Sequence, residues 1–469
     1  MKKLNLIILI LLLSFGLKAQ DETTPVSHYC YYKLHNYSGS RAVLYALRGS
    51  QMIPLDTARV QLNAFVFSDI HLYPVGMYRI KFDDSLFTEL IFNDEDIVIE
   101  ADASSIMASM LVKRSEENRV LFDYWRYALQ VRDSVAAVEF QKNKMYKSGR
   151  YSAQAAKAYD NKIEQLNDHL YDYIDKIKEE HPDLFAPVVL RSYLIPSYKR
   201  YLADKENTPY PNEKLFYLYH FFDNIDFSDA RLLNTRIIYT AINDYMTTFA
   251  KPAKTSVYKD IVDRVMGLAK ANEAVYQYCA GLFVEAFDNT IWEDVFVYVV
   301  DKYYLKSKTY NPQQAAYYKK KVETIKSLRL GKIIPDISLP DTSGNMVSLH
   351  SVKAKAKMLL IYSSDCSHCR EMMPDLQEIY DAYHPDGFEI YAIAIDDRAD
   401  VWLNEIRKEG YKWISVSDLK GLTSPVLDKY NVWMTPTMFM LDSKNMIVNK
   451  PRSAADIHAT LLQLLKMDR

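Results

Sequence analysis

The chain has 469 residues, more than one ordinary hydrophobic core contains, so the sequence predicts two to four domains. Apolar residues make up 49% of the chain and charged residues 25%, a balance typical of a soluble globular protein. The formal net charge is −2, and a chain without a basic stripe gives no reason to expect nucleic acid as a partner.

Residues 1–19 have the pattern of a secretory signal peptide. Lys2 and Lys3 form a positively charged start, residues 6–13 are an unbroken apolar run, and residues 16–19 provide a cleavage region. The run is shorter than the ~20 residues that cross a bilayer, which makes a retained anchor the weaker alternative. We expect cleavage near Ala19 and a soluble, exported, periplasmic mature protein.

Residues 20–112 are predicted to form a β-rich N-terminal domain. β-branched and aromatic runs are separated by Gly, Asn, Asp and Pro, which predicts an antiparallel sheet folded into a small β-sandwich. In the first run, Cys30, Tyr32 and Leu34 would share one buried strand face. The predicted strands lie within residues 28–36, 41–49, 63–70, 77–84, 86–94 and 96–102.

Residues 113–330 are predicted to form a central all-α domain, without a clear internal repeat. Its first helix has Val120, Tyr124, Tyr127 and Val131 at helical spacing, and a second long helix stops at Pro182. Further helices are predicted within residues 212–222, 231–246 and 257–283. The last begins at residues 311–312, an Asn cap followed by Pro at the first helical position, and ends near residue 328.

Residues 331–469 are predicted to form a C-terminal α/β domain, because strands and helices alternate here and several strands are wholly apolar. A helix is expected to begin at the CSHC sequence of residues 366–369, directly after an apolar strand. Predicted strands cover residues 358–364, 388–396, 413–418, 437–443 and 446–450, and the other predicted helices cover residues 400–410 and 455–467.

The two cysteines of this motif are the candidate catalytic residues. A helix N-terminus presents free N–H groups and positive partial charge, so it stabilises Cys366 as a thiolate and lowers its pKa below ~8.5. Cys369 lies one helical turn on, close enough to form a disulfide. A protonated His368 would further stabilise the thiolate and make the couple a stronger oxidant.

Residues 331–469 resemble the thioredoxin-fold thiol–disulfide oxidoreductases of the TlpA/ResA type. The resemblance rests on an entry segment with Pro335 and Asp336, on CSHCREMMP, on AIAIDDRADVWLNEI, and on YNVWMTPTMFMLDSKNMIV, in the family's order and spacing. It implies a thioredoxin fold without a cofactor or metal. It also implies that Thr435 and Pro436 stand where the family has a cis-proline beside the dithiol, holding substrate. The implied partners are protein disulfide or dithiol substrates and a membrane or periplasmic redox partner.

The sequence departs from this family at two positions. Asp365 stands where the family usually has Trp, and its charge would oppose the thiolate and partly cancel the effect of His368. Leu360 occupies the position of a buried Asp found in many thioredoxins. Proton transfer to Cys369 would then use water, His368 or another carboxylate, of which Glu371 is the nearest in sequence. The two upstream regions resemble modules of unknown function that precede such domains in exported bacterial proteins.

The motif has four other interpretations. A zinc site needs about four ligands, and no second Cys/His cluster accompanies Cys366 and Cys369. Inert core thiols would not explain a pair at a helix start. A peroxiredoxin-like peroxidase would need a proline and a threonine before its cysteine. A non-catalytic partner-binding scaffold would need neither cysteine. The other two cysteines, Cys30 and Cys279, are predicted to be small buried hydrophobes, with a bridge between them as the alternative.

Overall fold

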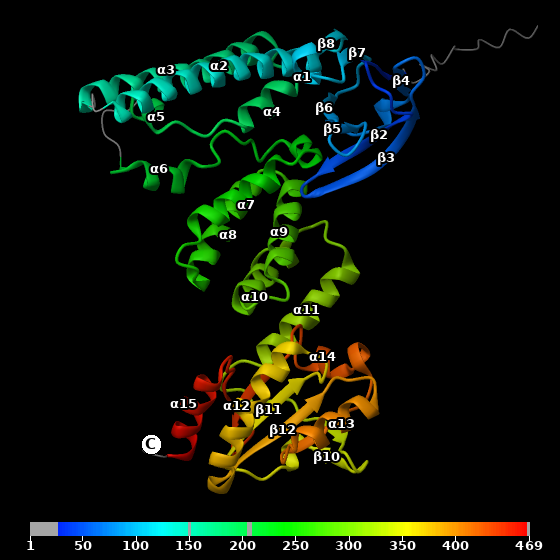
Figure 1. The fold of residues 1–469 in the computed structure, drawn as a ribbon, viewed down its shortest axis with the longest axis vertical. Helices are drawn as coiled ribbons and strands as arrows, with labels where there is room; N and C mark the ends of the chain where they lie inside the picture. The colour runs from blue at the N-terminus through cyan, green and yellow to red at the C-terminus, as the bar shows by residue number, and fades with distance from the viewer. Residues whose placement is uncertain (1–26, 149–151, 204–208, 467–469) are drawn as a thin grey trace, which may run out of the picture. The chain divides into compact units, whose positions relative to one another are not determined.

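The computed structural model describes residues 27–148, 152–203 and 209–466, and the chain forms two compact units, Met1–Ala241 and Ile242–Arg469 (Figure 1). Each unit buries its own hydrophobic cores. The predicted signal peptide, residues 1–19, lies outside the described residues. None of the helices in the described part of the chain is both long and apolar enough to span a bilayer.

The first unit begins with two four-stranded sheets around one core, which confirms the predicted β-sandwich. One sheet has the strand order β4-β1-β7-β8 and the other β3-β2-β5-β6. Cys30, Tyr32 and Leu34 of β1 all point into the core, as their alternation predicted. The strands are β1 (Cys30–His35), β2 (Arg41–Arg48), β3 (Gln51–Arg59), β4 (Ala64–Phe67), β5 (Gly76–Lys81), β6 (Phe87–Phe92), β7 (Ile97–Asp102) and β8 (Leu111–Arg114).

Two features of the sandwich differ from the sequence prediction. Antiparallel pairing was expected throughout, but β1 pairs with β7 in parallel. Parallel neighbours need a long crossover, and the intervening strands β2–β6 supply it. The sequence also missed β8 and β3, both of which are mostly exposed, and β3 includes Pro54. β3 lies at the edge of its sheet, where a strand needs no buried face and tolerates proline. It therefore lacks both sequence features by which a strand is recognised, namely alternating apolar residues and the absence of proline.

Helices follow the sandwich, as predicted. The first unit contains α1 (Ile106–Ser109), α2 (Glu116–Lys147), α3 (Ala153–Glu180), α4 (Ala186–Ser192), α5 (Tyr198–Ala203) and α6 (Glu213–His220), and α7 (Ile237–Phe249) crosses into the second. The second unit continues with α8 (Thr255–Ala269), α9 (Glu273–Phe287), α10 (Glu293–Lys302) and α11 (Pro312–Ser327). The side chain of Asn311 caps α11 by accepting from the amides of Gln313 and Gln314, at the predicted start.

The compact units do not coincide with the predicted domain limits. The limit between residues 112 and 113 falls inside β8, and the helical region of residues 113–330 is divided between the two units after Ala241. Cys30 lies in the first unit and Cys279 in the second, and both are free, buried thiols rather than a disulfide. Burial raises the pKa of each to about 12, which keeps both thiols protonated and inert at neutral pH.

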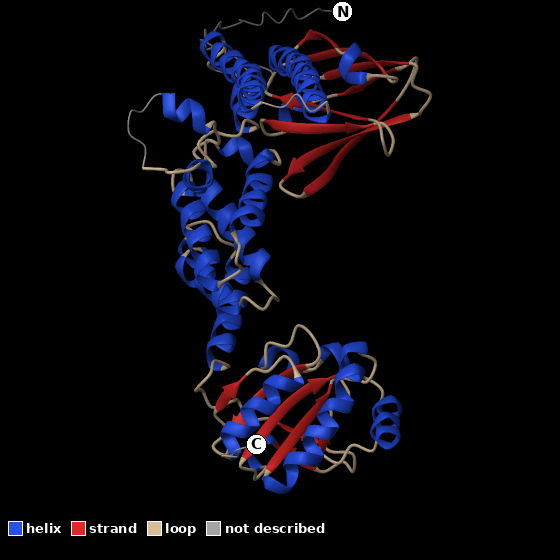
Figure 2. Ribbon diagram, turned by 60° about the vertical axis from the view of Figure 1, so that its left-hand side comes forward, coloured by secondary structure: helices blue, strands red, loops and turns tan. Residues whose placement is uncertain are grey.

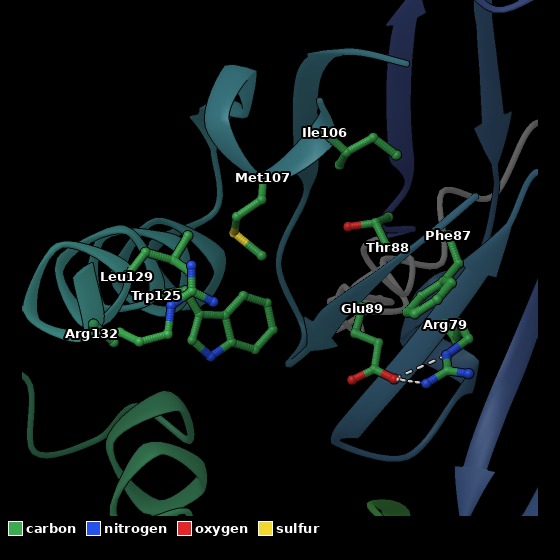
Figure 3. Close-up of a pocket in the computed structure, with 10 residues that line it drawn as sticks. Arg79, Phe87, Thr88, Glu89, Ile106, Met107, Trp125, Leu129 and Arg132 are labelled. Atoms are coloured by element: carbon green, nitrogen blue, oxygen red, sulfur yellow. Dashed lines mark hydrogen bonds and ion pairs between the residues drawn. The ribbon is translucent and has the colours of Figure 1, made fainter. Parts of the chain in front are cut away.

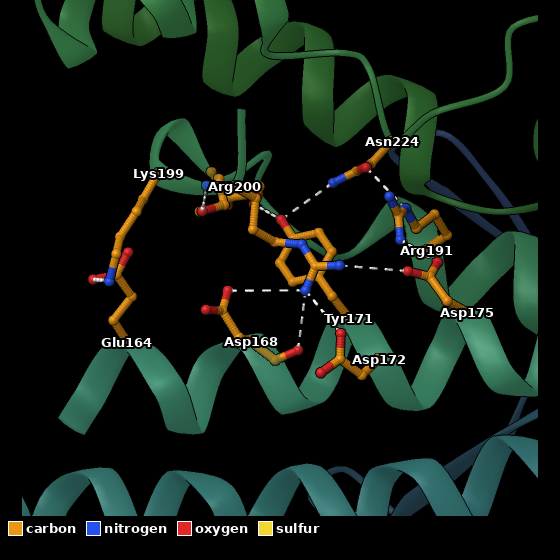
Figure 4. A network of polar contacts seen from close by, with 11 residues as sticks. Glu164, Asp168, Tyr171, Asp172, Asp175, Arg191, Lys199, Arg200 and Asn224 are labelled. Carbon is orange, nitrogen blue, oxygen red and sulfur yellow. Dashed lines mark hydrogen bonds and ion pairs between the residues drawn. The ribbon is translucent and has the colours of Figure 1, made fainter. Parts of the chain in front are cut away.

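An aromatic and ionic network fastens the short helices of the first unit to α3 (Figure 4). The ring of Tyr171 lies between two guanidinium groups, with Cζ of Arg191 and Cζ of Arg200 each 5.0 Å from its centroid. Arg191 also donates to Asp175 at 2.7 Å, and Arg200 donates to Asp172 at 2.9 Å. Because Tyr171 and its acidic neighbours all belong to α3, these contacts hold α4 and α5 against it.

The thioredoxin-like part of the second unit has a five-stranded sheet with the order β13-β12-β11-β14-β15. Strands β11, β12 and β13 are parallel, and β14 and β15 join antiparallel. The elements are β9 (Ser338–Pro340), β10 (Met346–Ser348), β11 (Ala356–Tyr362), α12 (Ser367–Tyr383), β12 (Phe388–Ala394), α13 (Ala399–Glu409), β13 (Ile414–Val416), α14 (Pro425–Lys429), β14 (Thr437–Asp442), β15 (Ile447–Asn449) and α15 (Ala454–Leu465).

Helices cover this sheet and bury its central strand, as Figure 2 shows. Every residue of β11 is buried, which confirms the predicted central strand. Met358, Leu360 and Tyr362 face the core shared with α12, α13 and α15. Leu359 and Ile361 face the core on the other side of the sheet. The strand therefore has no solvated face, and its end is the first place where the chain reaches solvent.

One buried carboxylate joins α2 to α4. Glu117 is 1% exposed, and it accepts hydrogen bonds from the backbone amides of Phe185 at 2.6 Å and Ala186 at 2.7 Å and from the side chain of Asn93. Burial raises the pKa of this carboxyl despite those hydrogen bonds. The free backbone amides at the start of α4 thus donate to the side chain of Glu117, which is distant in sequence.

Replacing Glu117 with Ala should destabilise the protein by about 2–4 kcal/mol, because two buried amides lose their acceptor. The matched control is Glu116→Ala, which removes an exposed ion pair with Arg119 and should cost no more than about 0.5 kcal/mol. Urea unfolding followed by circular dichroism measures both. Equal midpoints for the two variants would contradict the assigned role of Glu117.

Candidate active site

The dithiol lies where the buried strand β11 ends and α12 begins. Cys366 is the N-cap residue of α12, and its carbonyl accepts the first helical hydrogen bond, from Arg370, at 3.1 Å. The turn before it is held by Asp396, a buried carboxylate just beyond β12. This carboxylate accepts from Ser363 Oγ at 3.1 Å, from the Ser364 amide at 3.0 Å and from Ser364 Oγ at 2.7 Å. Asp396 therefore fixes the turn that presents Cys366.

Cys366 is half-buried and has the environment of an activated thiol. Burial alone raises its pKa. Hydrogen bonds from the Thr435 side chain, from the amide and thiol of Cys369 and from the amide of His368 outweigh burial and lower the pKa to about 7. A substantial fraction of this thiol is thus ionised at neutral pH, which makes Cys366 the nucleophile of the pair.

Cys369 has the opposite environment, although it is only one turn further along the helix. Its side chain is 1% exposed and packs in the core beside Met373 and Tyr362. Burial raises the pKa of Cys369 to about 11, and its hydrogen bond to Cys366 acts in the same direction. Cys369 is therefore a protonated thiol that substrate cannot reach, one helical turn from Cys366.

The structure places the two charged residues of the motif at the surface. His368 is exposed, and its backbone amide is among the groups that lower the pKa of Cys366. This amide is one of the free N–H groups of the helix N-terminus that the sequence predicted to stabilise the thiolate, in addition to the imidazole. Asp365 is also exposed, and its charge acts on Arg398, which forms an ion pair with Asp400 at 2.6 Å.

The loop before β14 completes the site. The Thr435–Pro436 peptide bond is cis, and the Thr435 carbonyl oxygen lies 3.5 Å from Cys366 Sγ. The segment of the chain predicted to bind substrate therefore lies against the nucleophilic sulfur. Two large side chains just before it, Trp433 and Met434, are 39% and 50% exposed. This loop thus offers exposed apolar surface next to the dithiol.

The structure identifies a carboxylate that the sequence analysis overlooked. Glu371 is exposed and lies two residues after Cys369, so it points to the other side of α12. Glu405 of α13 is half-buried, its pKa is raised by burial, and it accepts from the Tyr411 hydroxyl at 3.3 Å. Tyr411 packs against the core that contains Cys369, and the charge of Cys369 acts on it.

Thiol–disulfide exchange at this site requires only the two sulfurs and a proton acceptor. Each step transfers a bond between sulfur atoms, so the protein supplies thiolates rather than a bound group. Across the described ranges, no cluster of three or more His, Cys, Asp or Glu side chains is arranged to hold a metal ion.

The two thiol environments predict a pH profile for alkylation of the reduced protein by iodoacetamide. Only the thiolate reacts, so the rate at Cys366 should rise tenfold per pH unit below pH 7 and level off above it. At pH 8 only about one thousandth of Cys369, with a pKa of about 11, is ionised. Peptide mass spectrometry measures both sites, with Cys366→Ser as the control. Faster labelling of Cys369 than of Cys366 at pH 8 would contradict the assignment.

Two variants separate the contributions of His368. His368→Ala removes the imidazole and keeps the amide, whereas His368→Pro removes both, at a first-turn position that tolerates proline. His368→Pro should raise the pKa of Cys366 and make the dithiol–disulfide couple more reducing. Each unit of increase in the pKa is worth ~1.4 kcal/mol, which lowers the reduction potential of this two-electron couple by about 30 mV. Equilibration in glutathione buffers measures the potential. An unchanged or more oxidising His368→Pro protein would show that His368 is only a spacer.

Comparison with known proteins supports this description of the C-terminal part. Residues 330–450 match the family described as AhpC/TSA family. The chain is similar to the thiol-disulfide oxidoreductase ResA of Bacillus cereus, with 28% identity over 26% of this chain and 69% of that protein. It is also similar to the thioredoxin-like protein YneN of Bacillus subtilis, with 29% identity over 33% of this chain and 82% of that protein.

Solved structures with similarity to the chain include two from Bacteroides species. The thioredoxin domain of a thiol-disulfide oxidoreductase from Bacteroides vulgatus is 30% identical, covers 30% of this chain and 99% of its own, and has a TM-score of 0.28. A thioredoxin-like protein from Bacteroides caccae is 18% identical, covers 58% of this chain and 98% of its own, and has a TM-score of 0.43. From the family match, the named relatives and the dithiol, the C-terminal part of this chain is a thioredoxin-like domain of the AhpC/TSA family, of the thiol–disulfide oxidoreductase kind.

Proposed function

We propose that the protein is an exported thiol–disulfide oxidoreductase that exchanges disulfides with protein substrates through its Cys-Ser-His-Cys dithiol. The observation that carries the proposal is the contrast between two cysteines one helical turn apart. Cys366 is partly exposed with a pKa of about 7, and Cys369 is buried with a pKa of about 11. A nucleophile that substrate can reach and a second thiol that it cannot reach are the two components of disulfide exchange.

In the reducing direction, the Cys366 thiolate attacks one sulfur of a substrate disulfide. A mixed disulfide forms, and the other substrate sulfur leaves as a thiolate. Cys369 then loses its proton and attacks Cys366 Sγ, which releases the second substrate thiolate and leaves a Cys366–Cys369 disulfide. The substrate gains two electrons and the protein loses two. Glu405, in contact with Tyr411, is a carboxylate available for the proton of Cys369. In the oxidising direction the same steps run in reverse.

Protein substrates fit the surface around the dithiol. Thr435 and Pro436 lie beside Cys366 Sγ, and the exposed Trp433 and Met434 extend this loop. A substrate chain held in extended form along this loop would bring its disulfide to Cys366. Export follows from the signal-peptide pattern of residues 1–19, and an oxidising compartment is where such a dithiol finds disulfides. A membrane or periplasmic redox partner would then return Cys366 and Cys369 to their starting redox state.

Replacing the buried cysteine tests the proposed order of attack. Cys369→Ser should trap mixed disulfides with partner proteins, because the second step is blocked, whereas Cys366→Ser should trap none. Non-reducing gels of periplasmic extracts detect the adducts. Insulin turbidity with dithiothreitol measures the activity. Wild type should accelerate insulin precipitation, and the catalysed rate should be at least about 100-fold lower for each variant. A wild-type protein without activity would favour a non-catalytic scaffold, and trapping by Cys366→Ser alone would reverse the roles.

Processing tests the proposed location. The mature protein should begin near Gln20 and fractionate with soluble periplasmic contents, because a signal peptidase removes the apolar run. N-terminal sequencing of the purified native protein measures this. Intact Met1 on membrane-bound protein would overturn the proposal of a soluble exported form.

A further inference from the structure

The edge strand β6 in the first unit has backbone groups open to a partner. Strand β6 pairs only with β5, so its other side is an edge of the sheet. At Ile91 this edge is closed by Asn118 of α2, which accepts from the Ile91 amide at 2.9 Å and donates to the Ile91 carbonyl at 2.8 Å. The side chain of Asn118 thus takes the place of a neighbouring strand at one residue.

Two further residues of β6 point their backbone groups the same way. Backbone N–H and C=O directions alternate along a strand, so Phe87 and Glu89 face the same outer edge as Ile91. In the described part of the chain, no group forms a hydrogen bond with the backbone of Phe87 or Glu89 on that side. An open strand edge of this kind is a ready template for one more strand.

A pocket of about 610 Å³ lies beside this open edge (Figure 3). Its apolar wall comes from Ile106 and Met107 of α1 and from Trp125 and Leu129 of α2, opposite Phe87. A pocket of this volume takes one or two large side chains. Its lining is therefore suited to apolar groups that approach from the strand edge.

The charges at the pocket favour a bound segment in which an acidic side chain lies next to the apolar one. Arg79 is already neutralised, because its Nε donates to Glu89 at 2.9 Å and its guanidinium lies 4.2 Å above the Phe87 ring. Arg132 also lines the pocket, and its ion pair with Asp133 at 3.2 Å joins two side chains that are both more than 70% exposed. Such an exposed pair is weak, so Arg132 remains available to a carboxylate.

We propose that this face binds an extended peptide segment of a partner protein, which adds as a strand to β6 at Phe87 and Glu89 and places a large apolar side chain in the pocket. A flanking acidic side chain would pair with Arg132. Strand addition supplies affinity through the backbone, and the pocket selects the side chain. This binding function is separate from the dithiol and goes beyond the proposed disulfide exchange.

The probe is a phage-displayed library of random linear dodecapeptides, selected on the full-length Cys366→Ser/Cys369→Ser protein so that no disulfide capture contributes. Enriched peptides should carry a large apolar residue near an acidic one. Their affinities are then measured by fluorescence anisotropy. A library that shows no enrichment over a blank surface would overturn the proposal.

Matched variants test the two halves of the site separately. Glu89→Pro removes one outward N–H, which an edge strand tolerates, and Glu89→Ala removes the same side chain but keeps that N–H. Binding should be about fivefold or more weaker for Glu89→Pro than for Glu89→Ala. Leu129→Arg, which fills the pocket with charge, should weaken binding at least about tenfold. The far-ultraviolet circular dichroism spectrum and the urea midpoint of each variant should match wild type, which shows that the sandwich is still folded.

Two other occupants would each overturn the proposal. If peptides N-methylated at every second residue bind as well as their parents, the pocket takes an apolar group without strand addition. If light scattering shows a dimer that Glu89→Pro dissociates, the edge pairs with a second copy of this chain. Peptide binding is measured on a protein without the active cysteines. A lack of peptide binding is therefore distinguishable from a lack of disulfide exchange.

Discussion

The N-terminus of α12 sets two thiols with the same chemistry in opposite environments. Cys366 sits at the cap, where free amides can reach its sulfur, and Cys369 sits one turn later on the face that packs into the core. The difference between a pKa of about 7 and one of about 11 follows from this placement together with the hydrogen bond that Cys366 receives from Thr435. It depends in turn on where β11 ends, because a wholly buried strand releases the chain to solvent only at its last residue. Asp396 then fixes the turn in between.

The parts of the fold that the sequence predicted are those encoded by contiguous residues. The apolar run of β11, the cap at Asn311 and Pro312, and the alternation of Cys30, Tyr32 and Leu34 are local patterns, and each appeared where expected. The parts that were missed depend on distant partners. β3 is a strand only because β2 offers it an edge, and the parallel pairing of β1 with β7 depends on the chain between them.

The same distinction applies to the site. The cysteines and the Thr435–Pro436 loop could be located from motifs, but Asp396 and Glu405 could not, because their roles arise from packing between β12, α13 and the start of α12. His368 shows a related limit. The sequence predicts that the helix end as a whole stabilises the thiolate, and the structure shows which amides contribute, with that of His368 among those that lower the pKa of Cys366. Any residue except proline would supply that amide at this position.

A dithiol offers a substrate very little binding surface, since the reacting atoms are three sulfurs and the adjoining loop is short. A thiol–disulfide oxidoreductase gains selectivity when other contacts hold the substrate chain near the dithiol, because the second contact then becomes intramolecular and its effective concentration rises into the millimolar range. The open edge of β6 and the pocket beside it would recognise extended backbone and one apolar side chain, and they belong to a different compact unit from the dithiol. Extended, incompletely folded chains are also the ones whose disulfides are still exposed to exchange. The N-terminal sandwich and the thioredoxin-like domain would then select the same conformation of a partner by two different chemistries.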